Sequence, residues 1–344
     1  MDPIRSSKVP GGTLVSDGRP CPRGFVPRRW LSSGHLQTIA SNFLPRDNRL
    51  PAPEDRLFSV EPGVQVLCQC HWQAGRGPRT TLIIVHGLEG SSESQYVIGT
   101  SNKAWAAGMN VVRMNMRNCG GTEELTPTLY NCGMSADVGA IVRTLINEDG
   151  LRSIALSGFS MGGNLVLKLA GEWGTEAPLE IKAVTAVSPI IDLSISSRAL
   201  HDWRNRIYEY RFLRALHARM KRKAKLYPRQ YKAYPLFSIR SLRDFDDQVT
   251  APHGGFTDAE DYYERAGSAR VVEKIAVPTL IIYSLDDPFI RLTDATRAKI
   301  IANTNIRYIE TEHGGHCAFL AEADGHDGRW AECRLLEFVR EFAD

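Results

Sequence analysis

The stretch Ile154-Ala155-Leu156-Ser157-Gly158-Phe159-Ser160-Met161-Gly162-Gly163-Asn164 decides the fold of this chain. An apolar run leads directly into a Gly-x-Ser-x-Gly motif, and a helix-like segment follows from Asn164 to Trp173. A serine at such a strand-to-helix turn is pushed out at the carboxyl end of a parallel strand, where N–H groups of the next helix face any oxyanion. The motif therefore predicts a nucleophile elbow at Ser160, although five residues alone also fit a plain glycine-rich turn.

Strands and helices alternate on both sides of the elbow, which predicts a mostly parallel, doubly wound α/β sheet with helices on both faces. An antiparallel pair is expected first, followed by buried strands of the continuous apolar kind. The expected strands are 57–60, 64–71, 80–85, 111–114, the elbow strand, 183–187, 277–283 and 306–309, and the expected helices include 94–107, 134–147, 293–301 and 330–342. Ligands of such sheets bind outside the carboxyl ends of the strands.

The rhythm of strands and helices divides the chain into four parts. Residues 1–24 are rich in Gly, Ser, Pro and charge and predict a loose N-terminal tail. Residues 25–192 and 276–344 form the predicted α/β core, and residues 193–275 are predicted to be an inserted helical lid over the carboxyl edge of the sheet. The arm from Phe25 to Leu44 is expected to lie against the core, with Leu36, Ile39, Ala40 and Phe43 at helical spacing.

The inserted region carries a concentrated positive charge. Between Arg198 and Lys232 there are twelve Lys or Arg residues and two acids. A periodic apolar series within this segment predicts a helix with one apolar and one basic face, formed by Ile207, Tyr210, Leu213, Leu216 and Met220. Two interpretations stay open: a solvated lid face, and peripheral contact with an anionic membrane.

The composition of the 344 residues limits the class of protein. A net charge of +3 is too small to indicate nucleic-acid binding, and no run of about 18 apolar residues predicts a membrane span. The first residues lack the apolar core of a secretion signal, and the seven cysteines lack the spacing of a disulfide framework. We therefore expect a cytoplasmic protein with reduced thiols, whose oligomeric state the sequence does not indicate.

A serine nucleophile needs a base, and the base needs a group that orients it. His316 is the predicted base, because two glycines before it let its loop reach the elbow, and His313 is the rival. Asp287 is favoured over Asp286 as the orienting acid, since Pro288 follows it in a tight turn. A third candidate acid is Asp192, which also follows a predicted strand.

Two backbone N–H groups are predicted to form the oxyanion hole. One is that of Met161, directly after the nucleophile, and the other is that of Leu88 in the loop after the 80–85 strand. We expect His86 and His35 to have structural roles. The chain contains no phosphate-binding loop and no dinucleotide fingerprint, and His313, His316 and Cys317 lack the further ligands of a metal site, so no cofactor and no metal is expected.

Several separated motifs together resemble the α/β-hydrolase superfamily, and within it the YheT-like branch, also called the AB-hydrolase-4 type. The resemblance spans residues 25–340 and rests on 34–38 (GHLQT), 86–91 (HGLEGS), 116–121 (MRNCGG), 158–164 (GFSMGGN), 287–289 (DPF), 313–316 (HGGH) and the lid segment 245–263. It implies an α/β-hydrolase fold, a Ser160–Asp287–His316 triad, and carboxylesterase or lipase-like activity. Some relatives act on phospholipids or acylglycerols, and some transfer acyl groups to alcohols.

The sequence thus predicts a serine esterase that forms an acyl-serine on short- to medium-chain or lipid-like esters. An acyltransferase that passes the acyl group to an alcohol would use the same residues. A non-catalytic module that binds a membrane surface through the basic helix is the remaining alternative. The basic helix and the lack of the membrane anchor found in eukaryotic relatives are the departures from the branch.

Overall fold

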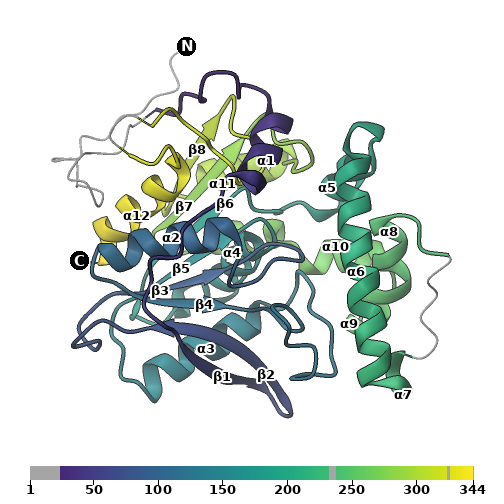
Figure 1. Ribbon diagram of the computed structural model, residues 1–344, viewed down its shortest axis with the longest axis horizontal. Helices are drawn as coiled ribbons and strands as arrows, with labels where there is room; N and C mark the ends of the chain where they lie inside the picture. Colours follow the sequence, from purple (N-terminus) through teal and green to yellow (C-terminus); the bar gives the residue numbers. More distant parts are fainter. Residues whose placement is uncertain (1–23, 232–237, 324–325, 344) are drawn as a thin grey trace.

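A twisted eight-stranded sheet passes through the computed structural model, which describes residues 24–231, 238–323 and 326–343 (Figure 1). Its strand order is β1-β2-β4-β3-β5-β6-β7-β8, in which β2 is antiparallel to both its neighbours and the remaining pairs are parallel. The strands are β1 Glu54–Glu61, β2 Val64–His71, β3 Thr81–Val85, β4 Asn110–Met114, β5 Ile154–Phe159, β6 Ile181–Val187, β7 Thr279–Ser284 and β8 Ile306–Thr311. The predicted fold class and its antiparallel first pair are confirmed.

Helices cover both faces of the sheet because each contributes apolar side chains to one of two large core clusters. On one face α2 (Gln95–Ala106) and α12 (Trp330–Ala343) pack against the strands. On the other face lie α3 (Ser135–Asn147), α4 (Met161–Trp173) and α11 (Asp294–Ala302). The central strands β3, β4 and β5 are buried along their whole length, as expected for apolar runs covered on both sides.

Between β6 and β7 the chain forms helices that lie to one side of the sheet (Figure 1). The longest is α6, and short helical turns link the others, including a π-helical turn at Asp246–Thr250. The helices are α5 Leu193–His201, α6 Arg206–Leu226, α7 Pro228–Tyr231, α8 Leu242–Phe245, α9 Ala251–Gly254 and α10 Ala259–Ala266. The division at residues 193 and 275 into core and lid stays a prediction, and the predicted tail lies outside the described residues except for residue 24.

The predicted apolar face of α6 is only partly correct. Leu213, Leu216 and Met220 are buried, but Ile207 and Tyr210 are 67% and 68% exposed. The buried side of the helix instead includes charged side chains such as Arg219, because acidic and carbonyl partners from the core meet them there. Periodicity identified the helix, but the contacts of its charged residues decide which way it faces.

The N-terminal arm forms helix α1 (Gly34–Phe43) and lies against the core, although not through the expected apolar positions. Leu36 and Phe43 are 50% and 79% exposed, whereas Gln37 and Thr38 are buried. The amide of Gln37 bonds the backbone of Leu320 at both its oxygen and its nitrogen. Polar contacts to a distant loop therefore orient α1, which leaves its apolar side chains on the surface.

In the described part of the chain, no helix is long and apolar enough to cross a membrane. The six described cysteines, Cys68, Cys70, Cys119, Cys132, Cys317 and Cys333, are all free.

Candidate active site

Ser160 lies at the turn between β5 and α4 with a backbone conformation that side chains rarely adopt, at φ 54° and ψ −116°. Such a conformation costs on the order of 1–3 kcal/mol and persists only where the surroundings enforce it. Glycines make the turn feasible, because a Cβ on Gly158 would overlap the backbone of Gly162, and one on Gly162 would overlap the carbonyl of Val85. The elbow geometry is therefore built into the glycine spacing.

The Asp287 carboxyl and the His316 ring lie side by side at the carboxyl edge of the sheet. Asp287 Oδ2 is 2.8 Å from His316 Nδ1, and the Asp287 side chain is fully buried. Asp287 Oδ1 accepts hydrogen bonds from the backbone N–H groups of Phe289 and Ile290. These donors fix the carboxylate, which in turn fixes the orientation of the imidazole.

The three rival residues have other partners. Asp286 accepts a hydrogen bond from the N–H of Gly315 at 2.8 Å and lies 3.3 Å from His313 Nδ1. Asp192 accepts hydrogen bonds from Thr293 and Thr296 at the start of α11. Asp286 therefore organises the loop that carries His316, and Asp192 anchors a helix.

One carbonyl links the turn of Ser160 to Cys317, the residue after His316. Val187 O accepts a hydrogen bond from Ser160 N at 2.9 Å and lies 3.6 Å from Cys317 Sγ. Among the described residues no hydrogen bond joins the Ser160 hydroxyl to His316, and His316 Nε2 lies 3.8 Å from Cys317 Sγ. Catalytic hydrogen bonds are often long without substrate and tighten in the reacting complex.

Opposing effects act on the His316 imidazole. Burial of the ring lowers its pKa, but the adjacent Cys317 and the Asp287 carboxylate raise it, and the net result is a pKa well above the ordinary value. The ring of Phe289 also packs on it, with centroids 4.4 Å apart. A group of this kind holds a proton readily, which suits a base that must accept one during a reaction.

The backbone N–H groups of Leu88 and Met161 are both without a hydrogen-bond acceptor among the described residues. The loop before Leu88 approaches the elbow so closely that a Cβ on Gly87 would lie 3.1 Å from Ser160 Cβ. His86 stabilises this loop, since its Nδ1 bonds Gly87 O and its Nε2 accepts from the N–H of Met116. Burial lowers the pKa of His86 to about 4, and its two hydrogen bonds agree with the structural role expected of it.

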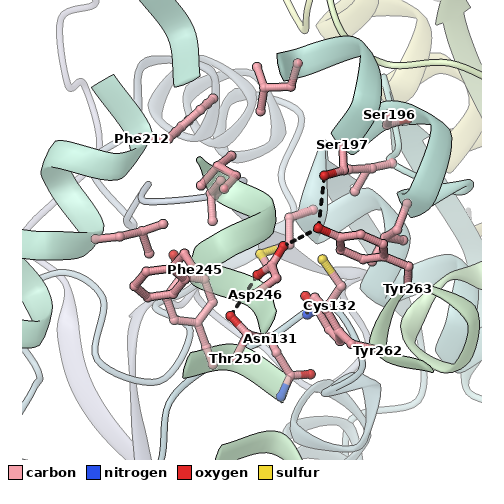
Figure 2. A pocket seen from close by; sticks show the side chains of 18 of the residues that line it. Asn131, Cys132, Ser196, Ser197, Phe212, Phe245, Asp246, Thr250, Tyr262 and Tyr263 are labelled. Atoms are coloured by element: carbon pink, nitrogen blue, oxygen red, sulfur yellow. Dashed lines mark hydrogen bonds between the residues drawn. The ribbon is translucent and has the colours of Figure 1, made fainter. Parts of the chain in front are cut away.

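Ser160 opens into an apolar pocket formed jointly by the core and the helices between β6 and β7 (Figure 2). The core contributes Leu88, Leu129 and Ile190, and the helices contribute Leu200, Phe212, Leu216 and Met220. Hydrocarbon walls of this kind suit the carbon chain of a substrate better than a charged or strongly hydrated one.

Sequence reasoning missed several groups that support the site. Thr38 in α1 accepts a hydrogen bond from the N–H of His316 at 2.8 Å, and Ser188 Oγ accepts one from Cys317 N at 3.0 Å. His35, expected to be structural, stacks on Tyr208 of α6 and lies 3.1 Å from its hydroxyl. Only the GHLQT motif signalled that α1 takes part, and nothing in it indicated which loop it contacts.

One cluster in the described residues has the composition of a metal site, formed by His326, Asp327 and Cys333. Its donor atoms already have partners: Asp327 pairs with Lys103 and Arg46, and His326 Nδ1 accepts a hydrogen bond from the N–H of Gly328. Cations next to the carboxylate oppose binding of another cation there.

The sheet order, the strained serine turn and the buried acid–histidine pair define a hydrolase of the α/β class. The chain belongs to the α/β hydrolase fold family, whose sequence profile matches residues 80–323. Within that family it is a YheT-like esterase: it is 32% identical to Escherichia coli YheT, a protein whose name assigns it provisionally to the esterases, over 93% of this chain and 94% of that one. It is therefore an enzyme, a hydrolase of the esterase or lipase-like kind.

More distant relatives carry related activities in their names. Human phospholipase ABHD3 is 24% identical, with 93% of this chain and 79% of that protein covered. The yeast medium-chain fatty acid ethyl ester synthase/esterase 2 is 28% identical over 95% of this chain and 77% of its own length. Among solved structures, the Pyrococcus furiosus esterase Pf2001 superimposes with a TM-score of 0.55 at 16% identity, over 85% of this chain and 93% of that one, which supports the fold alone.

Proposed function

We propose that this protein hydrolyses carboxylic esters through an acyl-serine intermediate, with Ser160 as nucleophile, His316 as base and Asp287 as the acid that orients it. The observation that carries the proposal is the buried Asp287–His316 hydrogen bond of 2.8 Å beside the strained turn at Ser160.

In the proposed reaction Ser160 Oγ attacks the ester carbonyl carbon while His316 Nε2 takes the hydroxyl proton. Asp287 accepts the Nδ1–H bond and stabilises the imidazolium. The N–H groups of Leu88 and Met161 hold the oxyanion of the tetrahedral intermediate. Its collapse breaks the bond to the alcohol, which leaves with the proton from His316. Water then attacks the acyl-serine carbonyl while His316 takes a proton from the water. Collapse of the second tetrahedral intermediate releases the carboxylic acid, and His316 returns the proton to Ser160 Oγ.

The apolar pocket supports short- to medium-chain acyl esters or lipid-like esters as substrates. The test is turnover of p-nitrophenyl esters of two to twelve carbons, combined with labelling by a fluorophosphonate. We expect wild type to react, and Ser160→Ala to lose both turnover and labelling. A wild-type protein that neither turns over esters nor becomes labelled would contradict the proposal.

An acyltransferase with the same residues is the second candidate. The yeast ethyl ester synthase/esterase similarity favours it, as does the apolar pocket, because a dry site lets an alcohol compete with water for the acyl-serine. Hydrolysis in the presence of increasing ethanol separates the two. An acyltransferase forms much more ethyl ester than the ratio of ethanol to water concentrations would give, whereas an esterase forms mainly free acid.

A peripheral membrane contact through α6 is supported by the exposed start of this helix together with the 3-10 turn Trp203–Asn205 that precedes it. Trp203, Ile207 and Tyr210 are 73%, 67% and 68% exposed beside exposed Arg204 and Arg206. Aromatic and basic side chains together suit an anionic lipid surface. Sedimentation with vesicles of phosphatidylglycerol should exceed that with phosphatidylcholine and fall with salt. Equal sedimentation with both lipids would exclude the contact.

A further inference from the structure

Asp246 is the carboxylate in the wall of the Ser160 pocket (Figure 2). Asp246 and Arg219 are the two charged residues that line the pocket. Arg219 forms a two-point ion pair with Glu89 at 2.8 and 3.1 Å. Within the described residues Asp246 forms no ion pair. The charge of Arg243 acts on the Asp246 carboxyl, but Arg243 is itself paired with Glu260 at 3.1 Å.

The hydrogen bonds around Asp246 leave half of its acceptor capacity open. Thr250 Oγ1 donates to Oδ1 at 2.8 Å, and the Tyr263 hydroxyl donates to Oδ2 at 2.9 Å. Since Tyr263 gives its only proton to Asp246, Ser197 must donate to Tyr263 across their 2.9 Å contact. Figure 2 shows this relay ending at the carboxylate. An ionised carboxylate has about four lone-pair sites, so about two remain for another donor.

The hydrogen bonds from Thr250 and Tyr263 account for only part of the acceptor capacity of Asp246. Thr250 and Tyr263 donate to different oxygens of Asp246, an arrangement that suits a carboxylate better than an amide, which has one acceptor oxygen. A carboxylate without a cationic partner is nevertheless destabilising beside apolar side chains. Burial raises the pKa of Asp246 to about 6, so the group is mostly ionised at neutral pH. Asp246 also begins the π-helical turn, a distortion that occurs often at functional sites.

We propose that Asp246 is a substrate-specificity residue, which accepts a hydrogen bond from a hydroxyl or protonated amino group on the carbon chain of the ester. This inference rests on the proposed function, because it assumes that the pocket holds the substrate of Ser160. The apolar walls bind the hydrocarbon, and the carboxylate selects a chain that carries a donor at the matching distance. A plain alkyl chain would leave the open acceptor sites of the half-buried carboxylate without a donor, which disfavours its binding.

The test uses matched pairs of esters in two series. In the acyl series, p-nitrophenyl esters of ω-hydroxy and ω-amino acids are compared with alkanoates of equal length from four to ten carbons. In the alcohol series, butyrates of diols and amino alcohols are compared with those of alkanols. The measured quantity is the ratio of kcat/KM for the substituted ester to that for the plain ester. Separate hydroxyl and amino arms identify the donor.

We expect wild type to favour a substituted ester by roughly 10- to 100-fold at one chain length, the range for a hydrogen bond to a charged group. Asp246→Asn should bring this ratio towards one. Asp247→Asn is the matched control, because Asp247 is exposed and instead accepts a hydrogen bond from the N–H of Ala259, so this variant should keep the wild-type ratio. Preference for plain esters at every length in both series would overturn the inference, as would an unchanged ratio in Asp246→Asn.

A second measurement needs no variant and covers the case that Asp246→Asn does not fold. The ratio for amino over plain esters in wild type should fall from pH 7.5 to pH 5, as Asp246 gains a proton, while the shared dependence on His316 cancels. The other groups facing Asp246 are Thr250, Arg243, Tyr263, Tyr262 and Cys132, and burial raises the pKa of the last three. A ratio that is constant over this range contradicts the inference. If Ser160→Ala loses turnover but wild type shows no preference for substituted over plain esters, this inference alone is refuted and the proposed function stands.

Discussion

At the scale of single residues, the two neighbouring acids before Pro288 have opposite environments. Asp287 is buried and bonded to His316, whereas Asp286 binds the N–H of Gly315. The sequence favoured Asp287 over Asp286 and left Asp192 as a third candidate, but it could not show that the N–H groups of Phe289 and Ile290 fold back onto the carboxyl of Asp287.

Replacing Asp287 should therefore damage activity far more than replacing Asp286. We expect Asp287→Asn to lower kcat by on the order of 10³- to 10⁴-fold, because the amide favours the wrong tautomer of the imidazole. Asp286→Asn is the matched control and should cost about tenfold or less. Steady-state kinetics on a p-nitrophenyl ester distinguishes them, and equal losses in both variants would contradict the assignment.

The raised pKa of His316 gives a pH prediction with a definite sign. The base must be unprotonated to act, so activity is lost as the pH falls through its pKa, and the raised value moves this loss to higher pH. We expect the acidic limb of kcat/KM to lie above the ordinary histidine value of about 6.5. The rate of fluorophosphonate labelling should show the same limb. A limb below pH 6 would contradict this.

Asp246 gives a stability prediction. Its pKa is about 6 in the folded protein against the model-compound value of 3.8, so the folded state keeps a proton that the unfolded chain releases. Stability therefore falls as the pH rises from about 4 to 6 and then levels off. Between pH 4 and pH 7 the stability of Asp246→Asn relative to wild type should therefore rise by up to about 3 kcal/mol. Urea unfolding at pH 4 and pH 7 measures it, and an advantage as large at pH 4 would contradict the account.

At the scale of elements, α6 is joined to the oxyanion loop by a buried ion pair. Arg219 binds both carboxylate oxygens of Glu89, the residue after Leu88, and its guanidinium lies 5.2 Å from the ring centroid of Tyr130. Tyr130 in turn donates to Glu89 and accepts from its N–H. Helix α6 therefore fixes the position of the proposed oxyanion donor as well as forming a wall of the pocket.

Breaking the Arg219–Glu89 ion pair should lower kcat more than it weakens substrate binding. We expect Arg219→Met to lower kcat by roughly 10- to 100-fold with a smaller change in KM, because a displaced donor weakens transition-state stabilisation. Arg222→Met, an exposed neighbour that pairs with Glu123 at 2.6 Å, is the control and should stay near wild type. Loss of affinity alone, with kcat unchanged, would show that Arg219 only shapes the pocket.

Adding Glu89→Gln to Arg219→Met should cost less than the sum of the two single changes, since the second change removes the unpaired charge left by the first. Additive losses would mean that the two residues act separately.

At the scale of the whole molecule, the sequence predicted the sheet to within a few residues per strand, because buried parallel strands are nearly continuous apolar runs. It also predicted helices α1 and α6 but oriented their apolar faces wrongly at Leu36 and Ile207. Those orientations depend on polar contacts with loops more than a hundred residues away, which local periodicity does not encode. For the same reason the sequence did not predict that Asp246 lines the pocket of Ser160, since that pocket is assembled from segments far apart in the chain.

The arrangement of the arm has a consequence for biosynthesis. Thr38, near the start of the described chain, holds the loop of His316, near its end, while the elbow at Ser160 forms in between. On the ribosome the serine turn therefore emerges well before the proposed base, and a nascent polypeptide without residue 316 would carry an unactivated hydroxyl. With the proposed roles, hydrolysis requires that the segment around His316 has been synthesised and has bound Thr38, so a polypeptide that stops before residue 316 should be inactive.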